Sequence, residues 1–299
     1  MNKTLNQETQ VLVNKYKVGE FSGVISKCSQ LLKKYPKNDF LWNLAGLSFQ
    51  RIEKNDNAIT SFQNAISANP DNHAAQNNLA ISYKNNREYD KAEKILNKLI
   101  RSHPNYLNAT VTLANLKNDT YFFDEAIEYY KKALKIEPNL PQLYVNISSI
   151  FQIQNKMDEA KEFLFKALKL NNYFTKADEL LGRILDYKDD KNDFHLNEMI
   201  DKLDNNKLNN DDKISLQFSI GKAFEDKKDY EKSFKYLEAG NDLKKKKNKS
   251  SIKYYKKKAE ILKKFFSKFD FTKIDKHVGA SKKIFIFGLP RSGTTLLER

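Results

Sequence analysis

Four prolines divide the first half of this chain into units of equal length. Pro36, Pro70, Pro104 and Pro138 stand thirty-four residues apart, and Asn172 occupies the next slot. A repeat of this length is typical of a pair of antiparallel α-helices. Proline ends each unit because its ring blocks continuation of the second helix. One helix pair cannot bury its apolar side alone, so the units must stack and share one core.

Small residues recur in phase with the prolines. Twelve residues before each proline or its slot, the second helix has Val24, Ala58, Ala92, Ala126 and Ala160. The first helices have a small position at Gly46, Ala80, Ala114 and Ser148, followed three residues later by Phe49, Tyr83, Lys117 and Phe151. Lys117 breaks this otherwise aromatic series. Cys28 falls on the buried side of a second helix, so we expect a small core residue rather than a reactive thiol.

In period and phase, residues 5–172 resemble tetratricopeptide (TPR) repeats. The resemblance implies a mainly α fold, a TPR α-solenoid of antiparallel helix pairs in a right-handed superhelix. It also implies that a concave wall of first helices holds an extended peptide. The positions expected to line this wall are Asn43, Gln50, Asn77, Asn78, Lys84, Val111, Thr112, Asn118, Asn146 and Gln152. Amides along a groove can hydrogen-bond a peptide backbone of any sequence, but Asn is also abundant throughout this chain.

The phase slips after Asn172. Residues 188–212 are rich in Asn, Asp and Lys, and only residues 195–203 form a short amphipathic segment. The phase returns at Ile214, and the further unit is marked by Ile220, Gly221, Phe224, Ser233 and Leu237. We therefore interpret residues 173–247 as degenerate helical repeats. Residues 248–283 are predicted to form a basic amphipathic helix, at about residues 254–269, followed by a linker.

The last sixteen residues, 284–299, have the layout of an anion-binding loop. Residues 284–287 predict a buried strand, and residues 296–299 predict the first turn of a helix. Gly288 and Gly293 have the spacing of a phosphate loop, but Thr294 follows where a nucleoside-triphosphate loop has Lys, which disfavours a triphosphate hydrolase. Backbone N–H groups at the start of a helix attract an anion, and Arg291 supplies a planar cationic fork.

Residues 288–295 resemble the 5′-phosphosulfate-binding loop of sulfotransferases that use 3′-phosphoadenylyl sulfate (PAPS). The likeness is greatest to protein-tyrosine sulfotransferases and to bacterial enzymes that carry TPR repeats in front. The resemblance implies that residues 284–299 begin an α/β P-loop-like sulfotransferase domain with PAPS as co-substrate. The PAPS-binding residues it implies are Arg291, Ser292, Gly293, Thr294 and Thr295. It assigns no catalytic residue, because the family's base lies beyond the loop.

Two functional hypotheses follow. In the first, the chain is the N-terminal part of a TPR sulfotransferase that transfers the sulfuryl group from PAPS to a hydroxyl, on a protein acceptor positioned by the repeats. Because the chain stops four residues after the loop, we expect a truncated domain and no activity from this chain alone. In the second, the chain is a non-catalytic TPR scaffold for protein partners that carries a vestigial sulfotransferase motif.

The net charge of +15 is concentrated in one block. Residues 241–283 contain sixteen Lys and four acidic residues. Runs of like charge usually face water, so we do not favour nucleic acid as a partner, although such a block can also bind an anionic membrane.

Targeting and metal signals are missing from the sequence. No apolar run reaches the ~18 residues of a membrane span, and the N-terminus lacks the apolar centre of a signal peptide, which predicts a cytoplasmic protein. The four histidines, His73, His103, His195 and His277, lack metal-ligand spacing, so no metal site is predicted.

Overall fold

The computed structural model describes residues 3–204, 207–247 and 252–267, and within these ranges the chain is mainly helical and contains no strand. The mainly α prediction is therefore confirmed. The helices are α1 (Lys3–Lys17), α2 (Phe21–Lys34), α3 (Asp39–Arg51), α4 (Asn55–Ala68), α5 (His73–Asn85), α6 (Tyr89–Ser102), α7 (Leu107–Asp119), α8 (Phe123–Ile136), α9 (Pro141–Ile153), α10 (Met157–Leu170), α11 (Thr175–Ile184), the 3₁₀ helix η1 (Asp190–Asn192), α12 (Asp193–Leu203), α13 (Asn210–Asp226), α14 (Tyr230–Lys247) and α15 (Ile252–Phe266).

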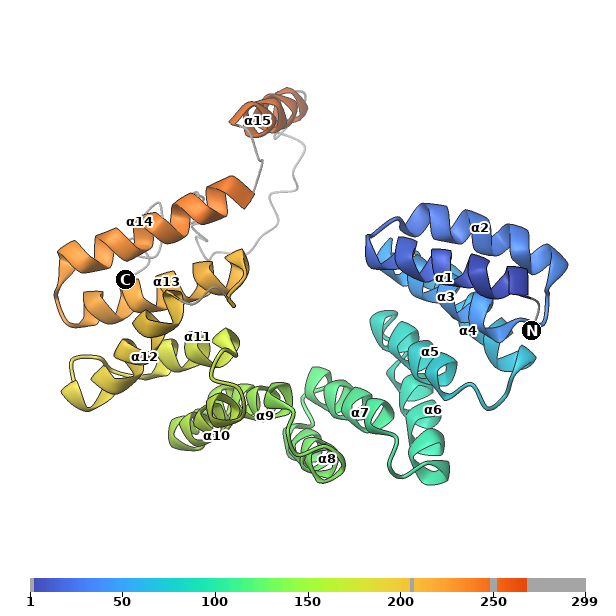
Figure 1. The fold of residues 1–299 in the computed structure, drawn as a ribbon, viewed down its shortest axis with the longest axis horizontal. Coiled ribbons are helices and arrows are strands. Elements are labelled where there is room, and N and C mark those ends of the chain that lie inside the picture. The colour runs from blue at the N-terminus through green and yellow to red at the C-terminus, as the bar shows by residue number, and fades with distance from the viewer. Residues whose placement is uncertain (1–2, 205–206, 248–251, 268–299) are drawn as a thin grey trace, which may run out of the picture. The chain divides into compact units, whose positions relative to one another are not determined.

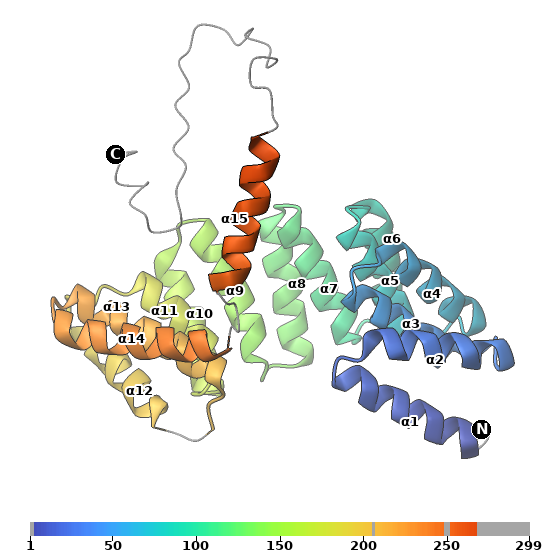
Figure 2. The ribbon, with the colours of Figure 1, turned by 90° about the horizontal axis from the view of Figure 1, so that it is seen from above.

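The chain forms two compact units, residues 1–243 and 244–299, which are described separately. In the first unit each first helix packs against the second helix of its own pair, as α3 does with α4 and α7 with α8. Each second helix also packs against the next first helix, as α4 does with α5 and α6 with α7. The helices of this unit follow one another in chain order (Figures 1 and 2). These contacts confirm stacked helix pairs.

The predicted small positions form the core of the stack. Val24, Ala58, Ala92, Ala126 and Ala160 are all 0% exposed. The larger residues one turn further along the second helices, Phe62, Leu96, Tyr130 and Leu164, are buried as well. Cys28 is also fully buried, and burial raises the pKa of its thiol to about 12. The prediction that Cys28 is a core residue is therefore confirmed.

A left-handed residue joins the two helices of each regular pair. The residues with positive φ are Gly19, Glu53, Arg87, Tyr121 and Asn155, again thirty-four residues apart, and Lys228 between α13 and α14. At each of the last five turns, the N–H that follows the left-handed residue donates to a carbonyl five residues earlier, as Lys54 does to Phe49 at 2.9 Å. This geometry is a Schellman motif, which satisfies the last carbonyls of the first helix. The sequence did not predict it, because Glu, Arg and Tyr have no preference for positive φ.

The predicted slip in phase is real. After α11 ends at Ile184, no second helix starts in phase, and η1 and α12 follow instead. The amphipathic segment predicted at residues 195–203 lies within α12. The pairing resumes with α13 and α14, where a Cβ added to Gly221 would lie 2.7 Å from the Leu237 side chain. The helix predicted at residues 254–269 is α15, which begins two residues earlier. Residues 284–299, predicted to be a strand, loop and helix start, lie outside the described residues.

Candidate functional site

Charge is divided unequally between first and second helices in the regular part of the stack. Helices α6, α8 and α10 each carry six Asp, Glu, Lys or Arg residues. In contrast, α5 carries only Lys84, α7 carries only Lys117 and Asp119, and α9 carries none. The second helices α6, α8 and α10 therefore face water as charged surfaces, whereas the first helices α5, α7 and α9 are nearly neutral. The second helix α4, whose one charged residue is Asp56, does not follow this division.

We define the first-helix surface as the ten positions predicted to line the wall. All ten lie on first helices: Asn43 and Gln50 on α3, Asn77, Asn78 and Lys84 on α5, Val111, Thr112 and Asn118 on α7, and Asn146 and Gln152 on α9. Eight are half-buried. The prediction was wrong for Asn77 and Thr112, each only 6% exposed, because stacking of neighbouring first helices covers them.

Amide groups join α3 to α5. The Nδ2 atom of Asn78 donates to Oδ1 of Asn43 at 3.1 Å, and Nε2 of Gln50 donates to Oγ of Ser82 at 2.8 Å. The same Nε2 atom reaches the backbone oxygen of Asn78 at 3.3 Å. An amide side chain has two donor hydrogens and an oxygen with two lone pairs. These contacts use only part of that capacity and hold the amides in defined orientations.

Two amide oxygens on this surface have no hydrogen-bond partner among the described residues. They are Oδ1 of Asn77 and Oδ1 of Asn118. On α9, Nε2 of Gln142 donates to Oδ1 of Asn146 at 2.7 Å, and Nε2 of Gln152 donates to Oγ of Ser148 at 3.2 Å. Since nearly all buried acceptors in folded proteins are paired, the two unpaired oxygens are where a further donor is most needed.

The charged groups on α5 and α7 are paired. Nζ of Lys84 lies 2.5 Å from Oδ2 of Asp119, which links the two helices. The pairing leaves no net charge at this point of the first-helix surface.

Lys117, which broke the aromatic series, is a buried cation. It is 8% exposed, and its Nζ atom lies 2.7 Å from Glu93 on α6 and 2.9 Å from Glu125 on α8. Burial lowers the pKa of Lys117, but the hydrogen bonds to both carboxylates outweigh this effect, so the pKa is raised. Nζ also lies 5.2 Å from the centre of the Phe122 ring. Lys117 thus joins three consecutive helices.

Phe122 explains how a Lys replaces an aromatic residue here. In the next unit Phe151 holds the first-helix position, and Lys156, five residues later, places its Nζ atom 6.0 Å from the Phe151 ring. Around α7 the same two positions hold Lys117 and Phe122, so the cation and the ring are exchanged. The contact across the Schellman turn is kept in both arrangements.

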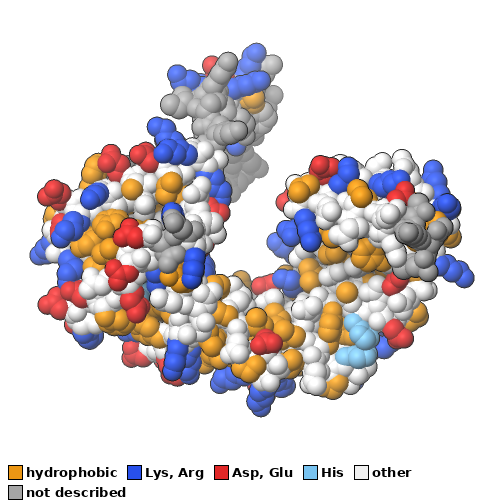
Figure 3. Space-filling view, viewed as in Figure 1, with side chains coloured by type: hydrophobic (Ala, Val, Ile, Leu, Met, Phe, Trp, Pro, Cys, Tyr) orange, Lys and Arg blue, Asp and Glu red, His pale blue; other side chains and the backbone are white. Residues whose placement is uncertain are grey.

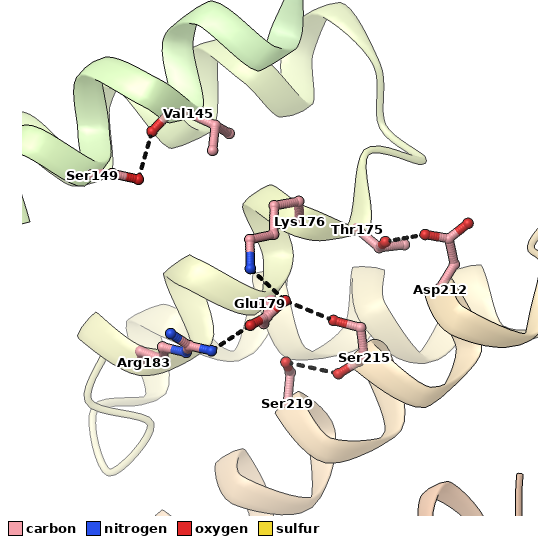
Figure 4. Close-up of polar contacts among 9 residues, drawn as sticks. All are labelled: Val145, Ser149, Thr175, Lys176, Glu179, Arg183, Asp212, Ser215 and Ser219. Atoms are coloured by element: carbon pink, nitrogen blue, oxygen red, sulfur yellow. Dashed lines mark hydrogen bonds and ion pairs between the residues drawn. The ribbon is translucent and has the colours of Figure 1, made fainter. Parts of the chain in front are cut away.

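A charged cluster on α11 and α13 was not predicted. Glu179 accepts hydrogen bonds from Lys176 at 3.0 Å, from Arg183, and from Oγ of Ser215 at 3.2 Å (Figure 4). Thr175 donates to Asp212 across the same pair of helices. The neutral character of the first helices therefore ends at α11.

A buried polar network fills the irregular unit. Tyr187 and Nδ1 of His195 are 2.7 Å apart, and Nε2 of His195 lies 3.2 Å from Oδ1 of Asp178. Lys202 donates to the same Oδ1 at 2.7 Å, and all four side chains are buried. Burial and the Asp178 carboxylate raise the pKa of Tyr187. Within the described residues Oδ2 of Asp178 has no partner, so one carboxylate oxygen holds both the imidazole and the ammonium group.

The predicted PAPS-binding residues, Arg291, Ser292, Gly293, Thr294 and Thr295, lie outside the described residues. Among those that are described, no cluster of three or more His, Cys, Asp or Glu could hold a metal ion. A search of the same residues for a helix long and apolar enough to cross a bilayer found none.

Family comparison decides what the helix pairs are. Residues 53–114 match one family model described as tetratricopeptide repeat, and residues 123–140 and 141–174 match a second model of that description. These segments are tetratricopeptide repeats. The matched TPR residues include α5, α9 and the part of α7 up to residue 114, and thus seven of the ten positions of the first-helix surface. The comparison with curated proteins found no match.

Solved TPR structures are similar to this chain. A structure of MamA residues 41-end from Desulfovibrio magneticus RS-1 is 13% identical, covers 58% of this chain and 98% of its own, and has a TM-score of 0.50. A second MamA structure is 24% identical and covers 53% of this chain and 93% of its own, with a TM-score of 0.47. YrrB, titled a TPR protein with an unusual peptide-binding site, is 17% identical and covers 58% and 89%, with a TM-score of 0.45. The first of these supports the solenoid fold.

Proposed function

We propose that this chain is a protein-interaction scaffold whose first-helix surface binds an extended peptide segment. The observation that carries the proposal is the division of charge: six charged residues on each of α6, α8 and α10, but none on α9 and one or two on α5 and α7. Amides both donate and accept, so they can pair with the N–H and C=O groups of an extended backbone. A surface of this kind recognises the backbone rather than the sequence of its partner.

An unpaired amide oxygen supports this proposal. Asn118 is half-buried on the first-helix surface, and its Oδ1 atom has no partner in the described structure. An unpaired buried acceptor costs about 1–3 kcal/mol, which a peptide N–H can recover if the amide rotates toward it. The same interaction would be worth much less on a second helix, where water already hydrates the polar groups.

Binding can be tested with a fluorescein-labelled neutral peptide of mixed sequence and its scrambled counterpart. Fluorescence anisotropy should show that both bind with similar affinity and that added salt changes this affinity little, because few charges are involved. Replacing Asn118, Asn146 and Gln152 together with Ala should weaken binding roughly tenfold or more, at about 0.5–1.5 kcal/mol per hydrogen bond. The matched control replaces Asn64 on α4 and Asn97 on α6, which are also half-buried amides. An equal loss in the control, or no binding to either peptide, would refute the proposal.

A second proposal rests on residues 288–295. We propose that this run binds the 5′-phosphosulfate group of PAPS and that the chain belongs to a sulfotransferase whose repeats position a hydroxyl acceptor on a protein. The support is the run of eight residues, Gly-Leu-Pro-Arg-Ser-Gly-Thr-Thr, after the apolar residues 284–287. Backbone N–H groups and the Arg291 guanidinium would oppose charge that develops on the leaving phosphate.

Titration calorimetry of PAPS with the chain tests this second proposal. Arg291→Ala should remove a charge-assisted contact of about 1.5–3 kcal/mol, a loss of roughly ten- to a hundredfold in affinity. Lys282→Ala is the matched control, since it removes a nearby cation from outside the motif. Equal losses from the two changes would mean that Arg291 only adds to a general attraction for anions.

A further inference from the structure

Helix α15, in the second unit, carries exposed Lys and exposed apolar side chains that peptide binding by the repeats does not explain. Its fifteen residues contain six Lys and one Glu. The described side chains from residue 256 to residue 264 are all exposed. They include two large apolar residues, Ile261, which is 60% exposed, and Leu262, which is 49% exposed.

The two kinds of side chain lie on different sides of the helix. At about 3.6 residues per turn, Ala259, Ile261 and Leu262 fall within one half of the helix circumference, with Leu262 between the other two. Lys256, Lys257, Lys263 and Lys264 occupy the opposite side. Lys258 alone among the Lys residues falls within the apolar half. A long Lys side chain at such a position can extend its ammonium group toward water or phosphate.

We propose that α15 binds the surface of an anionic lipid bilayer and lies in the plane of the headgroups. Its apolar side would enter the boundary of the acyl chains, and its Lys side would face the phosphate groups. A fifteen-residue helix is only about 22 Å long, shorter than the bilayer core, so it fits this orientation rather than a crossing one.

Lipid explains both halves of the helix, whereas nucleic acid explains only one. A phosphate backbone would pair with the Lys residues but would leave Ile261 and Leu262 in water. An acidic protein surface that also carries an apolar groove could contact both the Lys and the apolar side chains of α15. Such a protein is therefore the main alternative partner for this helix.

Sedimentation with vesicles tests the proposal on the whole chain. The chain should sediment with vesicles of phosphatidylcholine containing phosphatidylserine, sediment much less with vesicles of phosphatidylcholine alone, and be released by high salt. Replacing Lys256, Lys257 and Lys263 with Gln should lower partitioning by roughly a hundredfold, since each Lys near such a surface contributes about a fivefold factor. Replacing both Ile261 and Leu262 with Gln should lower partitioning at least tenfold, because two apolar side chains would no longer enter the bilayer. Gln keeps a high helix propensity in both variants.

The matched control is Val11→Gln with Val18→Gln, which removes two exposed apolar residues, 54% and 73% exposed, from the first unit. This control should leave vesicle binding unchanged. Equal sedimentation with both kinds of vesicle would overturn the proposal, and so would an equal loss of vesicle binding in the control. It would also be overturned if the parent chain bound no vesicles but bound a DNA oligonucleotide through the Lys residues replaced in the variant. Binding of the neutral peptide to the first-helix surface should be the same in all variants, which separates this proposal from the first.

Discussion

The close contact between Gly46 and Phe62 lets two opposing effects on stability be weighed, helix propensity against overpacking. A Cβ atom added at Gly46 would lie 2.6 Å from one carbon of the Phe62 ring and 2.8 Å from two others. Phe62 is fully buried, so its ring cannot swing into solvent. We expect Gly46→Ala to gain about 1 kcal/mol from helix propensity but to lose about 1–3 kcal/mol from overpacking, a net destabilisation of about 1 kcal/mol.

Gly23 provides the matched control because it also lies inside a helix, α2, but in open space. The nearest atom to a Cβ added there is Oε2 of Glu20 at 4.0 Å. Gly23→Ala should therefore stabilise the chain by about 1 kcal/mol, and the two variants should differ by about 2 kcal/mol.

Urea denaturation followed by the helical circular dichroism signal measures both changes. The transition midpoint should move down for Gly46→Ala and up for Gly23→Ala, with unchanged slopes. If Gly46→Ala stabilises the chain as much as Gly23→Ala does, then α3 and α4 are not in the close contact described here.

Three further predictions concern buried polar groups. Burial raises the pKa of Cys28 from 9.0 to about 12, so the native thiol should react slowly with Ellman's reagent. The free energy of unfolding should fall as the pH rises between these two values, because the thiol ionises first in the unfolded chain. A Cys28→Ala variant should lose less stability over this range. Replacing Glu93 and Glu125 together with Gln should lower the free energy of unfolding by about 1–3 kcal/mol, because it leaves the Lys117 ammonium buried without a carboxylate, and a negligible change would mean that Lys117 turns to water. Asp178→Asn should cost about 3–5 kcal/mol by stranding Lys202, and adding Lys202→Met should restore most of it, whereas additive losses in the double variant would contradict the pairing.

Much of the fold was predictable because its signals are local. A helix pair needs a small residue where its two helices approach each other and a proline or polar residue where the chain reverses. Both kinds of residue recur at a fixed interval along the chain. Ala58, Ala92, Ala126 and Ala160 could therefore be identified as core residues from spacing alone, and all four are fully buried. The slip after Asn172 was visible for the same reason, since the interval is lost there.

The candidate surface was only partly predictable. Helix phase placed all ten positions on first helices, but it did not show that Asn77 and Thr112 are covered, because their exposure depends on the neighbouring unit. Glu179 was missed because its partners come from two helices, and Ser215 lies thirty-six residues away. A sequence signal did exist for Lys117: Phe122 follows it by five residues, as Lys156 follows Phe151 in the next unit.

By itself, the sequence determined the unit length, the core positions and the limits of the regular repeats, because each depends on residues within one turn or one pair of helices. Only the tertiary structure decided which polar residues are buried and what they contact. Lys117, His195 and Asp178 look like ordinary surface residues in the sequence, yet all three are buried. A charged or polar side chain is stable inside a protein only if partners from other helices meet it there, and the meeting of those helices is a property of the folded stack.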